Sequence, residues 1–165
     1  MEILNKINAS GIQTLDLLFF KPHKDDIVFF DIVPFLIEDF LLQEKPFRLE
    51  MSKIDWSQFT GKDVVICCSN DAIIPLWSYM LISSLLSNYA TTVVYSKDVN
   101  DENLLWKERI RKIEFTVFSN QKVVIKANSS IPEEILVLAT SQLVKYVKTL
   151  MWGEAGSPVM IYKRK

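Results

Sequence analysis

Short runs of β-branched residues alternate along the chain with longer apolar stretches, a pattern typical of strands that alternate with helices. Turn residues bound two of the short runs, which predicts buried parallel strands at residues 64–68 and 123–126. Further strands are expected at residues 26–32, 91–95 and 158–162. The longer stretches predict helices at residues 73–88, 100–113 and 131–151, and residues 34–43 are either a helix or irregular.

Part of the chain repeats itself 59 residues later. Residues 53–59 read KIDWSQF and residues 112–118 read KIEFTVF, and a turn followed by Val-Val-Ile comes after each copy. Each copy then continues through small polar residues to a proline, Pro75 in the first copy and Pro132 in the second. We interpret the pattern as a duplicated supersecondary unit, with too few copies for a solenoid.

These elements predict an α/β fold in which a three-layer, mostly parallel sheet is built from a duplicated strand-loop-helix-strand unit. We expect a single domain over residues 1–165, with duplicated halves at residues 53–96 and 112–163. Residues 1–50 are expected to form an appended N-terminal edge element, because their pattern is less regular than that of the rest.

Composition supports a folded protein and excludes several kinds of site. The 165 residues are 49% apolar and 24% charged, which allows a buried core and excludes a mainly disordered chain. The single histidine, His23, excludes sites that need two histidines from one chain. Two cysteines exclude a disulfide framework and a four-cysteine zinc site.

The formal net charge of -1 argues against nucleic-acid binding by bulk charge, but the charge is unevenly distributed. Residues 1–82 carry a net charge of -5 and residues 83–165 a net charge of +4. The basic half is either a surface for a partner, including residues 163–165, or one of two solvated faces that attract each other or a second subunit. We favour the second interpretation, because the basic residues are scattered and not interleaved with aromatic residues.

The sequence predicts a soluble cytoplasmic protein. Its most apolar stretch, residues 73–86, is shorter than the about 20 residues that a bilayer span requires, so we expect a buried helix there. Residues 1–6 mix charged and apolar residues and do not resemble a secretory signal. Free cysteines fit a reducing compartment. We expect no membrane association and no nucleic-acid partner, and the chain is a candidate homodimer.

Polar residues follow the two duplicated strands, at the place where open α/β sheets usually bind ligands. The first strand end carries Cys67, Cys68, Ser69, Asn70 and Asp71, and the second carries Asn128, Ser129 and Ser130. Each leads into a helix N-terminus, which favours an anion and lowers the pKa of a thiol. The candidate anion or ligand site therefore consists of Ser69, Asn70, Asn128, Ser129 and Ser130, although turns commonly use such residues as well.

Cys68 is the candidate nucleophile or metal ligand, and Asp71 is a candidate general base, ligand or helix N-cap. Adjacent strand residues point to opposite faces, so Cys67 is expected to be buried packing material. The alternative for Cys68 is an inert core cysteine, which we favour because no histidine and no further usable thiol lies nearby in the sequence. For Asp71 we favour the N-cap.

The loop at residues 153–158 contains glycine but has no P-loop or dinucleotide fingerprint. Gly153 is expected to be the C-cap of the helix at residues 131–151, and Glu154 is a candidate metal ligand or acid. Ser130 and Glu133 have the spacing of a capping box at the start of that helix. The sequence specifies no Ser-His-Asp set and contains no HExxH or CxxC motif.

Several longer segments carry a family resemblance: DWSQ at residues 55–58, CSNDAIIPLWSYML at residues 68–81, VKTLMWGE at residues 147–154, and the ending YKRK at residues 162–165. They resemble the bacterial domain-of-unknown-function family 2480 over most of the chain. The resemblance implies no established activity. Members are often encoded near iron–sulfur assembly factors, which implies a link to metal or sulfur trafficking.

The resemblance also implies a metal site, from which this chain departs. Typical members carry cysteine at the positions of Cys68, Asn128 and Gly156, which we expect to share one cleft, and three thiolates there would bind a soft metal or cluster. Here only Cys68 remains. Either Asp71, Asn128 and Glu154 replace thiolates as oxygen ligands, or the site is lost or weakened, which we favour.

Three functions follow from these expectations. The favoured one is a non-catalytic binding or accessory protein with a weakened metal/thiol pocket, linked to iron–sulfur or metal handling. The alternative is an enzyme that uses Cys68 as nucleophile or thiol acceptor beside an anion site at a helix N-terminus. The third is a metal protein with a mixed site of Cys68, Asp71 and Glu154. The expected cofactor is none or a weakly held metal ion.

Overall fold

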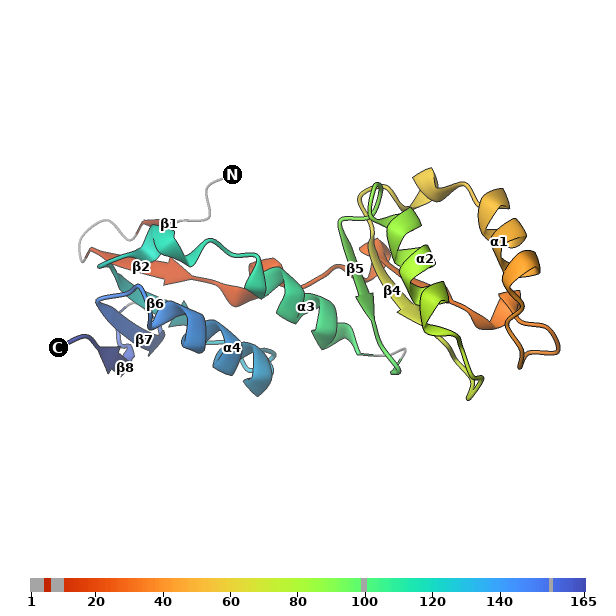
Figure 1. Cartoon of the computed structure of the whole chain (residues 1–165). Helices are drawn as coiled ribbons and strands as arrows, with labels where there is room; N and C mark the ends of the chain where they lie inside the picture. Colours follow the sequence, from red (N-terminus) through yellow and green to blue (C-terminus); the bar gives the residue numbers. More distant parts are fainter. Residues whose placement is uncertain (1–4, 7–10, 99–100, 155) are drawn as a thin grey trace. The chain divides into compact units, whose positions relative to one another are not determined.

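The computed structural model describes the chain except residues 1–4, 7–10, 99–100 and 155, and it divides the chain into two compact units (Figure 1). The terminal unit combines the two ends of the chain, Met1–Lys21 and Trp106–Lys165. The middle unit is Pro22–Leu105. The single domain over residues 1–165 that the sequence pattern predicts stays a prediction.

The sheet of the middle unit has the strand order β3-β4-β5 and is formed by β3 (Ile27–Asp31), β4 (Asp63–Cys67) and β5 (Thr92–Tyr95). Both strand pairs are parallel. Two helices follow β3 and β4 in the chain, α1 (Glu44–Lys53) and α2 (Leu76–Leu86) (Figure 1). Short 3-10 helices complete the unit: η2 (Lys24–Asp26), η3 (Val33–Phe35) and η4 (Trp56–Phe59).

The middle unit has its own apolar core, centred on β4. Every residue of this strand is buried, as expected of a β-branched central strand. Val64 and Ile66 of β4 pack in one cluster with side chains from α1, η4 and α2: Phe47, Met51, Trp56, Phe59, Ile82 and Leu86. Because β4 is packed on all its residues, the position of its end, where the candidate cysteines lie, is fixed by the core of the middle unit.

The sheet of the terminal unit has the order β1-β2-β6-β7-β8, formed by β1 (Asn5–Lys6), β2 (Ile12–Leu15), β6 (Lys122–Lys126), β7 (Thr149–Gly153) and β8 (Val159–Lys163). The three inner strands are parallel to one another, whereas β1 and β8 are antiparallel to their neighbours. The helices of this part of the chain are η1 (Leu17–Phe20), α3 (Glu102–Arg111), η5 (Phe115–Phe118) and α4 (Glu133–Leu143).

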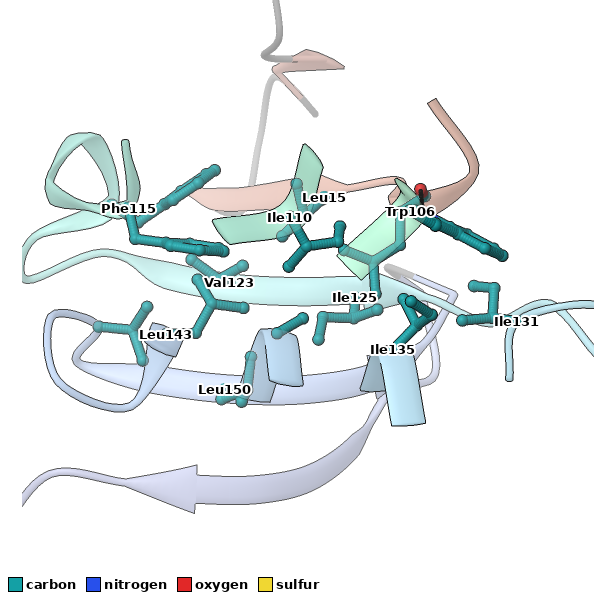
Figure 2. Packing of buried hydrophobic residues seen from close by; sticks show 14 residues of the cluster. Leu15, Trp106, Ile110, Phe115, Val123, Ile125, Ile131, Ile135, Leu143 and Leu150 are labelled. Carbon is teal, nitrogen blue, oxygen red and sulfur yellow. Dashed lines mark hydrogen bonds between the residues drawn. The ribbon is translucent and has the colours of Figure 1, made fainter. Parts of the chain in front are cut away.

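The core of the terminal unit lies against β6. Figure 2 shows side chains of α3 and α4 gathered around Val123 and Ile125 of this strand. Trp106 of α3 is buried and donates a hydrogen bond from its indole Nε1 to the backbone oxygen of Leu17, 3.2 Å away. Burial of a large aromatic side chain is therefore combined with satisfaction of its one polar group.

The two units share an order of elements. The strands β4 and β6 begin and end 59 residues apart, as do η4 and η5 before them. In the middle unit, β4 lies between β3, which precedes it in the chain, and β5, which follows α2. In the terminal unit, β6 lies between β2, which precedes it in the chain, and β7, which follows α4. The correspondence follows the repeat in the sequence, while duplication of an ancestral segment stays a prediction.

The predicted α/β class is confirmed, because the chain combines helices with mostly parallel sheets, consistent with the three-layer α/β fold expected from the sequence. The strands are nevertheless divided between two sheets. Residues 1–50 supply strands to both sheets: β2 pairs with β6 in one sheet, and β3 pairs with β4 in the other. The same residues include the start of α1. Residues 34–43 are irregular apart from the end of η3 and two isolated bridges. Asn100, expected at the start of a helix, lies outside the described residues, and α3 begins at Glu102.

The helix expected at residues 131–151 is wrong in its second half. Helix α4 ends at Leu143, and Thr149–Gly153 forms β7, which pairs in parallel with β6 from Lys122↔Thr149 onward. Leucine and methionine are good helix formers, but pairing with a buried strand outweighs their local preference. The proposed C-cap role of Gly153 is wrong for the same reason, since this residue ends a strand with φ of 126°.

Candidate functional site

Two cysteines stand in succession where β4 ends. Cys67 is its last residue, is 1% exposed, and lies 3.8 Å from the backbone oxygen of Phe30, to which its thiol donates. Burial raises the pKa of the Cys67 thiol to about 11, with a smaller contribution from the charge of Asp31. Cys67 is therefore buried packing material, as expected, and the half-buried Cys68 is the accessible thiol of the pair.

The Cys68 thiol is held by the loop that follows it. Its Sγ lies 3.2 Å from Oδ1 of Asn70, which also accepts a hydrogen bond from the backbone N–H of Ala72 at 3.0 Å. The amide Nδ2 of Asn70 donates to the backbone oxygen of Asp39 in the loop before α1. One asparagine side chain thus connects the thiol to two loops at the carboxyl end of the sheet.

A carboxylate joins the ends of β3 and β4. Asp31 accepts from the Ser69 hydroxyl at 2.6 Å and from the backbone N–H groups of Ser69 and Val33 at 3.1 Å each. Burial by itself raises the pKa of Asp31, but the hydrogen bonds from Ser69, Val33 and Ile32 outweigh burial and hold this pKa below its ordinary 3.8. Ser69 is therefore engaged with a carboxylate, which leaves its hydroxyl less suited to binding an anion.

Sequence reasoning missed Asp31 and the pair Tyr79 and Tyr95. The two tyrosine rings meet edge to face with centroids 5.2 Å apart, Tyr79 from α2 and Tyr95 from the end of β5. Burial, then the proximity of Tyr95 and Cys68, raises the pKa of Tyr79 to about 12. The available signal was that Asp31 lies next to the end of the strand predicted at residues 26–32 and that Tyr95 ends the strand predicted at residues 91–95. The residues that contact Asp31 and Tyr95 lie far away in the sequence.

Asp71 is exposed and does not cap α2. That helix begins at Leu76 with Pro75 as its N-cap residue, and no side chain caps it. The N-cap interpretation of Asp71 is therefore wrong, because four residues separate Asp71 from the first helical residue. The general-base and ligand interpretations of Asp71 stay predictions.

The end of β6 in the terminal unit has a self-contained turn. Asn128 Oδ1 accepts from the backbone N–H of Ser130 at 2.8 Å and from its hydroxyl at 2.6 Å, and Ser129 is exposed. The predicted capping box of Ser130 with Glu133 is wrong, since Pro132 is the N-cap residue of α4 and no side chain caps the helix. Glu133 and Glu134 occupy the first turn of α4, where their charges disfavour a bound anion.

The three positions expected to share one cleft belong to two sheets. Cys68 follows β4 in the middle unit, whereas Asn128 and Gly156 lie in the terminal unit, after β6 and β7. Glu154 is exposed directly after β7, and its backbone oxygen accepts from the N–H of Ser157 at 3.1 Å. Within the described part of the chain, no group of three His, Cys, Asp or Glu side chains has a geometry that holds a metal ion.

Comparison with known proteins gives one match. The family model described as "Protein of unknown function (DUF2480)" matches residues 1–164. The chain belongs to the DUF2480 family. The resemblance seen in the sequence is thus confirmed, and it covers nearly the whole chain. No curated protein and no solved structure matches it. In the described residues of this DUF2480 protein, no helix has the length and apolar character required to cross a membrane.

Proposed function

We propose that this DUF2480 protein is a cytoplasmic, non-catalytic binding or accessory protein, linked to iron–sulfur or metal handling, that acts through the thiol of Cys68. The observation that supports the proposal is the position of Cys68, half-buried at the carboxyl end of β4 and hydrogen-bonded to Asn70. Thiolate sulfur is a preferred ligand of soft metal ions. One thiol supplies one such ligand, which fits weak or transient binding.

The comparison of the two units supports a weakened site. We interpret the units as copies of one duplicated module, in which Ala127 stands after β6 where Cys68 stands after β4. An alanine supplies no ligand atom. On this interpretation, only the middle unit retains a thiol at this position of the module. Asp71 is the candidate oxygen ligand in the middle unit, and Glu154 is the candidate oxygen ligand in the terminal unit.

A nucleophilic role for Cys68 has weaker support. Activation of a thiol nucleophile usually requires a neighbouring base. The carboxylate of Asp31, at the end of the adjacent strand, instead accepts from Ser69 and Val33.

Cadmium binding followed by ultraviolet charge-transfer absorption tests the proposal, because the absorption reports a thiolate–metal bond. We expect weak binding of one ion per chain, abolished by Cys68→Ser and retained by Cys67→Val, which changes the buried neighbour. Elemental analysis of untagged protein purified without chelator complements the titration. Metal content that Cys68→Ser leaves unchanged, or an absence of thiolate absorption, contradicts the proposal.

The rate of thiol alkylation separates the accessory protein from the enzyme. We expect iodoacetamide to label Cys68 at pH 7 no faster than it labels a free cysteine peptide, whose pKa is about 8.5. Labelling much faster than the peptide, suppressed by inorganic phosphate, would favour the enzyme with an anion site and would overturn the non-catalytic role.

A further inference from the structure

The two units differ more in net charge than do residues 1–82 and residues 83–165. The terminal unit carries 13 Lys and Arg against 7 Asp and Glu, a net charge of +6. The middle unit carries 6 Lys and Arg against 13 Asp and Glu, a net charge of -7. The near-neutral chain is therefore made of one strongly basic and one strongly acidic unit.

The positive charge of the terminal unit is concentrated around Arg164. Its guanidinium donates to the backbone oxygen of Lys145 at 2.8 Å and to Oδ1 of Asn120 at 3.3 Å, and its backbone N–H donates to the oxygen of Lys148 at 2.9 Å. The strand register places Lys122 and Lys163 on either side of Thr149. The Arg164 contacts and this register bring together a set of exposed cations, which we call the basic surface: Lys122, Lys145, Lys148, Lys163, Arg164 and Lys165. No ion pair between described residues includes any of them.

The basic surface continues into an exposed apolar strand. In β8, which ends at Lys163, the side chains of Val159, Met160 and Ile161 are 61%, 55% and 52% exposed. The register of β8 with β7 shifts between Leu150 and Met151, which is a bulge. Bulges blunt a sheet edge against pairing with another strand, so contact through side chains is favoured over extension of the sheet.

The middle unit has an exposed surface of the opposite charge at the carboxyl end of its sheet. The loop before α1 and the loop after β4 are joined by the bridge Leu41↔Ile73 and by the hydrogen bond from Asn70 to Asp39. We define the acidic surface as seven exposed residues, the acidic and large apolar side chains around this junction and at the start of α2: Glu38, Asp39, Phe40, Leu41, Asp71, Ile73 and Leu76. Ile73 and Leu76 are each 79% exposed.

None of the ion pairs between described residues includes a carboxylate of the acidic surface. Its apolar side chains are also unusual for a solvated face, because contiguous exposed apolar patches commonly mark an interaction site. Both observations indicate a surface that binds a partner through apolar contact and negative charge.

We propose that the acidic surface of one chain binds the basic surface and β8 of a second copy of this chain. The surfaces match in two respects, since each combines unpaired charges of one sign with exposed apolar side chains. A two-fold dimer contains this contact twice and closes on itself. A nucleic acid would account for the basic surface alone and leaves the acidic surface without a partner.

The molar mass of the full chain in solution tests the dimer, measured by sedimentation equilibrium over a range of concentrations. We expect twice the chain mass of 19.1 kDa at low salt and dissociation as salt screens the charges. Because each substitution affects both contacts, Glu38→Lys and Lys163→Glu should each weaken the dimer by about tenfold or more. Asp25→Lys and Lys97→Glu make the same charge changes at exposed residues outside both surfaces and should leave the dimer unchanged.

A mixture of the two charge-reversed variants provides the decisive measurement. One contact of the mixed dimer has the original charges, and the other has them exchanged, so we expect the mixture to recover the affinity of the unaltered chain. A monomer at every salt concentration overturns the proposal, as does a dimer that neither reversal weakens. Reversals that lower folding stability without changing the molar mass also overturn it, because they indicate attraction within one chain.

Discussion

Ser69 donates both its hydroxyl and its backbone N–H to the carboxylate of Asp31, 38 residues earlier in the chain. The two residues stand at the ends of neighbouring parallel strands, since Asp31 pairs with Cys67 in the register of β3 and β4. This link fixes the loop that carries Cys68. The geometry of the candidate site therefore depends on a carboxylate that is outside the predicted set of site residues.

Removal of the carboxylate charge should destabilise the middle unit. We expect Asp31→Asn to lower the free energy of unfolding by about 1–3 kcal/mol, because hydrogen bonds to a charged acceptor are lost or weakened. Urea unfolding monitored by circular dichroism measures the change. In a double-mutant cycle, Asp31→Asn and Ser69→Ala should be strongly non-additive. Additive effects would show that the two side chains do not stabilise the unit through each other.

Acid pH should weaken the same link. The hydrogen bonds of Asp31 hold its pKa in the folded chain below the ordinary 3.8. A depressed folded-state pKa contributes stability above pH 3.8, and the contribution is lost as the pH falls from there through the folded-state pKa. Unfolding free energies measured below pH 4 should therefore fall more steeply for the unaltered chain than for Asp31→Asn, and parallel curves would contradict the assignment.

Much of the fold is predictable from local sequence, but strand pairing is not. The β-branched runs that form β4 and β6 are correctly predicted because both strands are buried and bounded by turns. Strand β7 looks helical because its stretch is rich in residues that also suit helices, and only pairing with β6 decides the matter. The four-residue strand β2 is too short to produce a period, and it joins β6 from more than 100 residues away.

The candidate site is predictable in part for a related reason. Cys68, Ser69, Asn70 and Asp71 are found because residues after a buried strand gather at one edge of a sheet. The partner Asp31 ends β3 and the partner Asp39 lies in the loop that follows, and no local pattern relates these residues to Ser69 or Asn70. The expectation of a single cleft with Asn128 was based on a single sheet, whereas the first fifty residues supply a strand to each of two sheets.

The two cysteines should differ in reactivity. We expect Ellman's reagent to titrate one thiol in the folded chain and both in guanidinium chloride, with Cys68→Ser abolishing the signal of the folded chain. The reason is the 1% exposure of Cys67 against the half-buried Cys68. Two reactive thiols in the folded unaltered chain, or a signal that persists in the folded Cys68→Ser variant, would contradict the burial of Cys67.

Alkaline pH should destabilise the middle unit through Cys67. Burial raises the pKa of Cys67 from its ordinary 9.0 to about 11 in the folded chain. A raised folded-state pKa contributes stability that is fully present below pH 9 and is lost as the pH rises toward 11. Unfolding measured across this range should show a smaller loss for Cys67→Val. An equal loss in the variant would assign the effect to other groups, such as Tyr79, whose pKa is about 12.

The buried tryptophans provide a matched test of the two cores. Trp106 donates to the backbone oxygen of Leu17 at 3.2 Å, and Trp56 donates to that of Met51 at 3.0 Å. Replacement of either by Phe leaves a buried carbonyl without its donor, which should lower the free energy of unfolding by about 1–3 kcal/mol. If the two units unfold in separate transitions, each variant should lower the midpoint of the transition of its own unit only. A variant that lowers the midpoints of both transitions would indicate that the two units unfold cooperatively.

The end of β7 should tolerate only glycine. Gly153 has φ of 126°, a conformation that residues with a side chain rarely adopt, while the Cβ of an alanine there would meet Pro158 Cα at an ordinary 3.5 Å. We therefore expect Gly153→Ala to destabilise the terminal unit by about 1–3 kcal/mol through backbone strain and not through a clash. Gly156→Ala, three residues later in open space and without a positive φ, is the control and should change stability by less than about 0.5 kcal/mol. Thermal unfolding of both variants measures the difference, and equal stabilities would show that the β7–β8 connection relaxes to accept a side chain at Gly153.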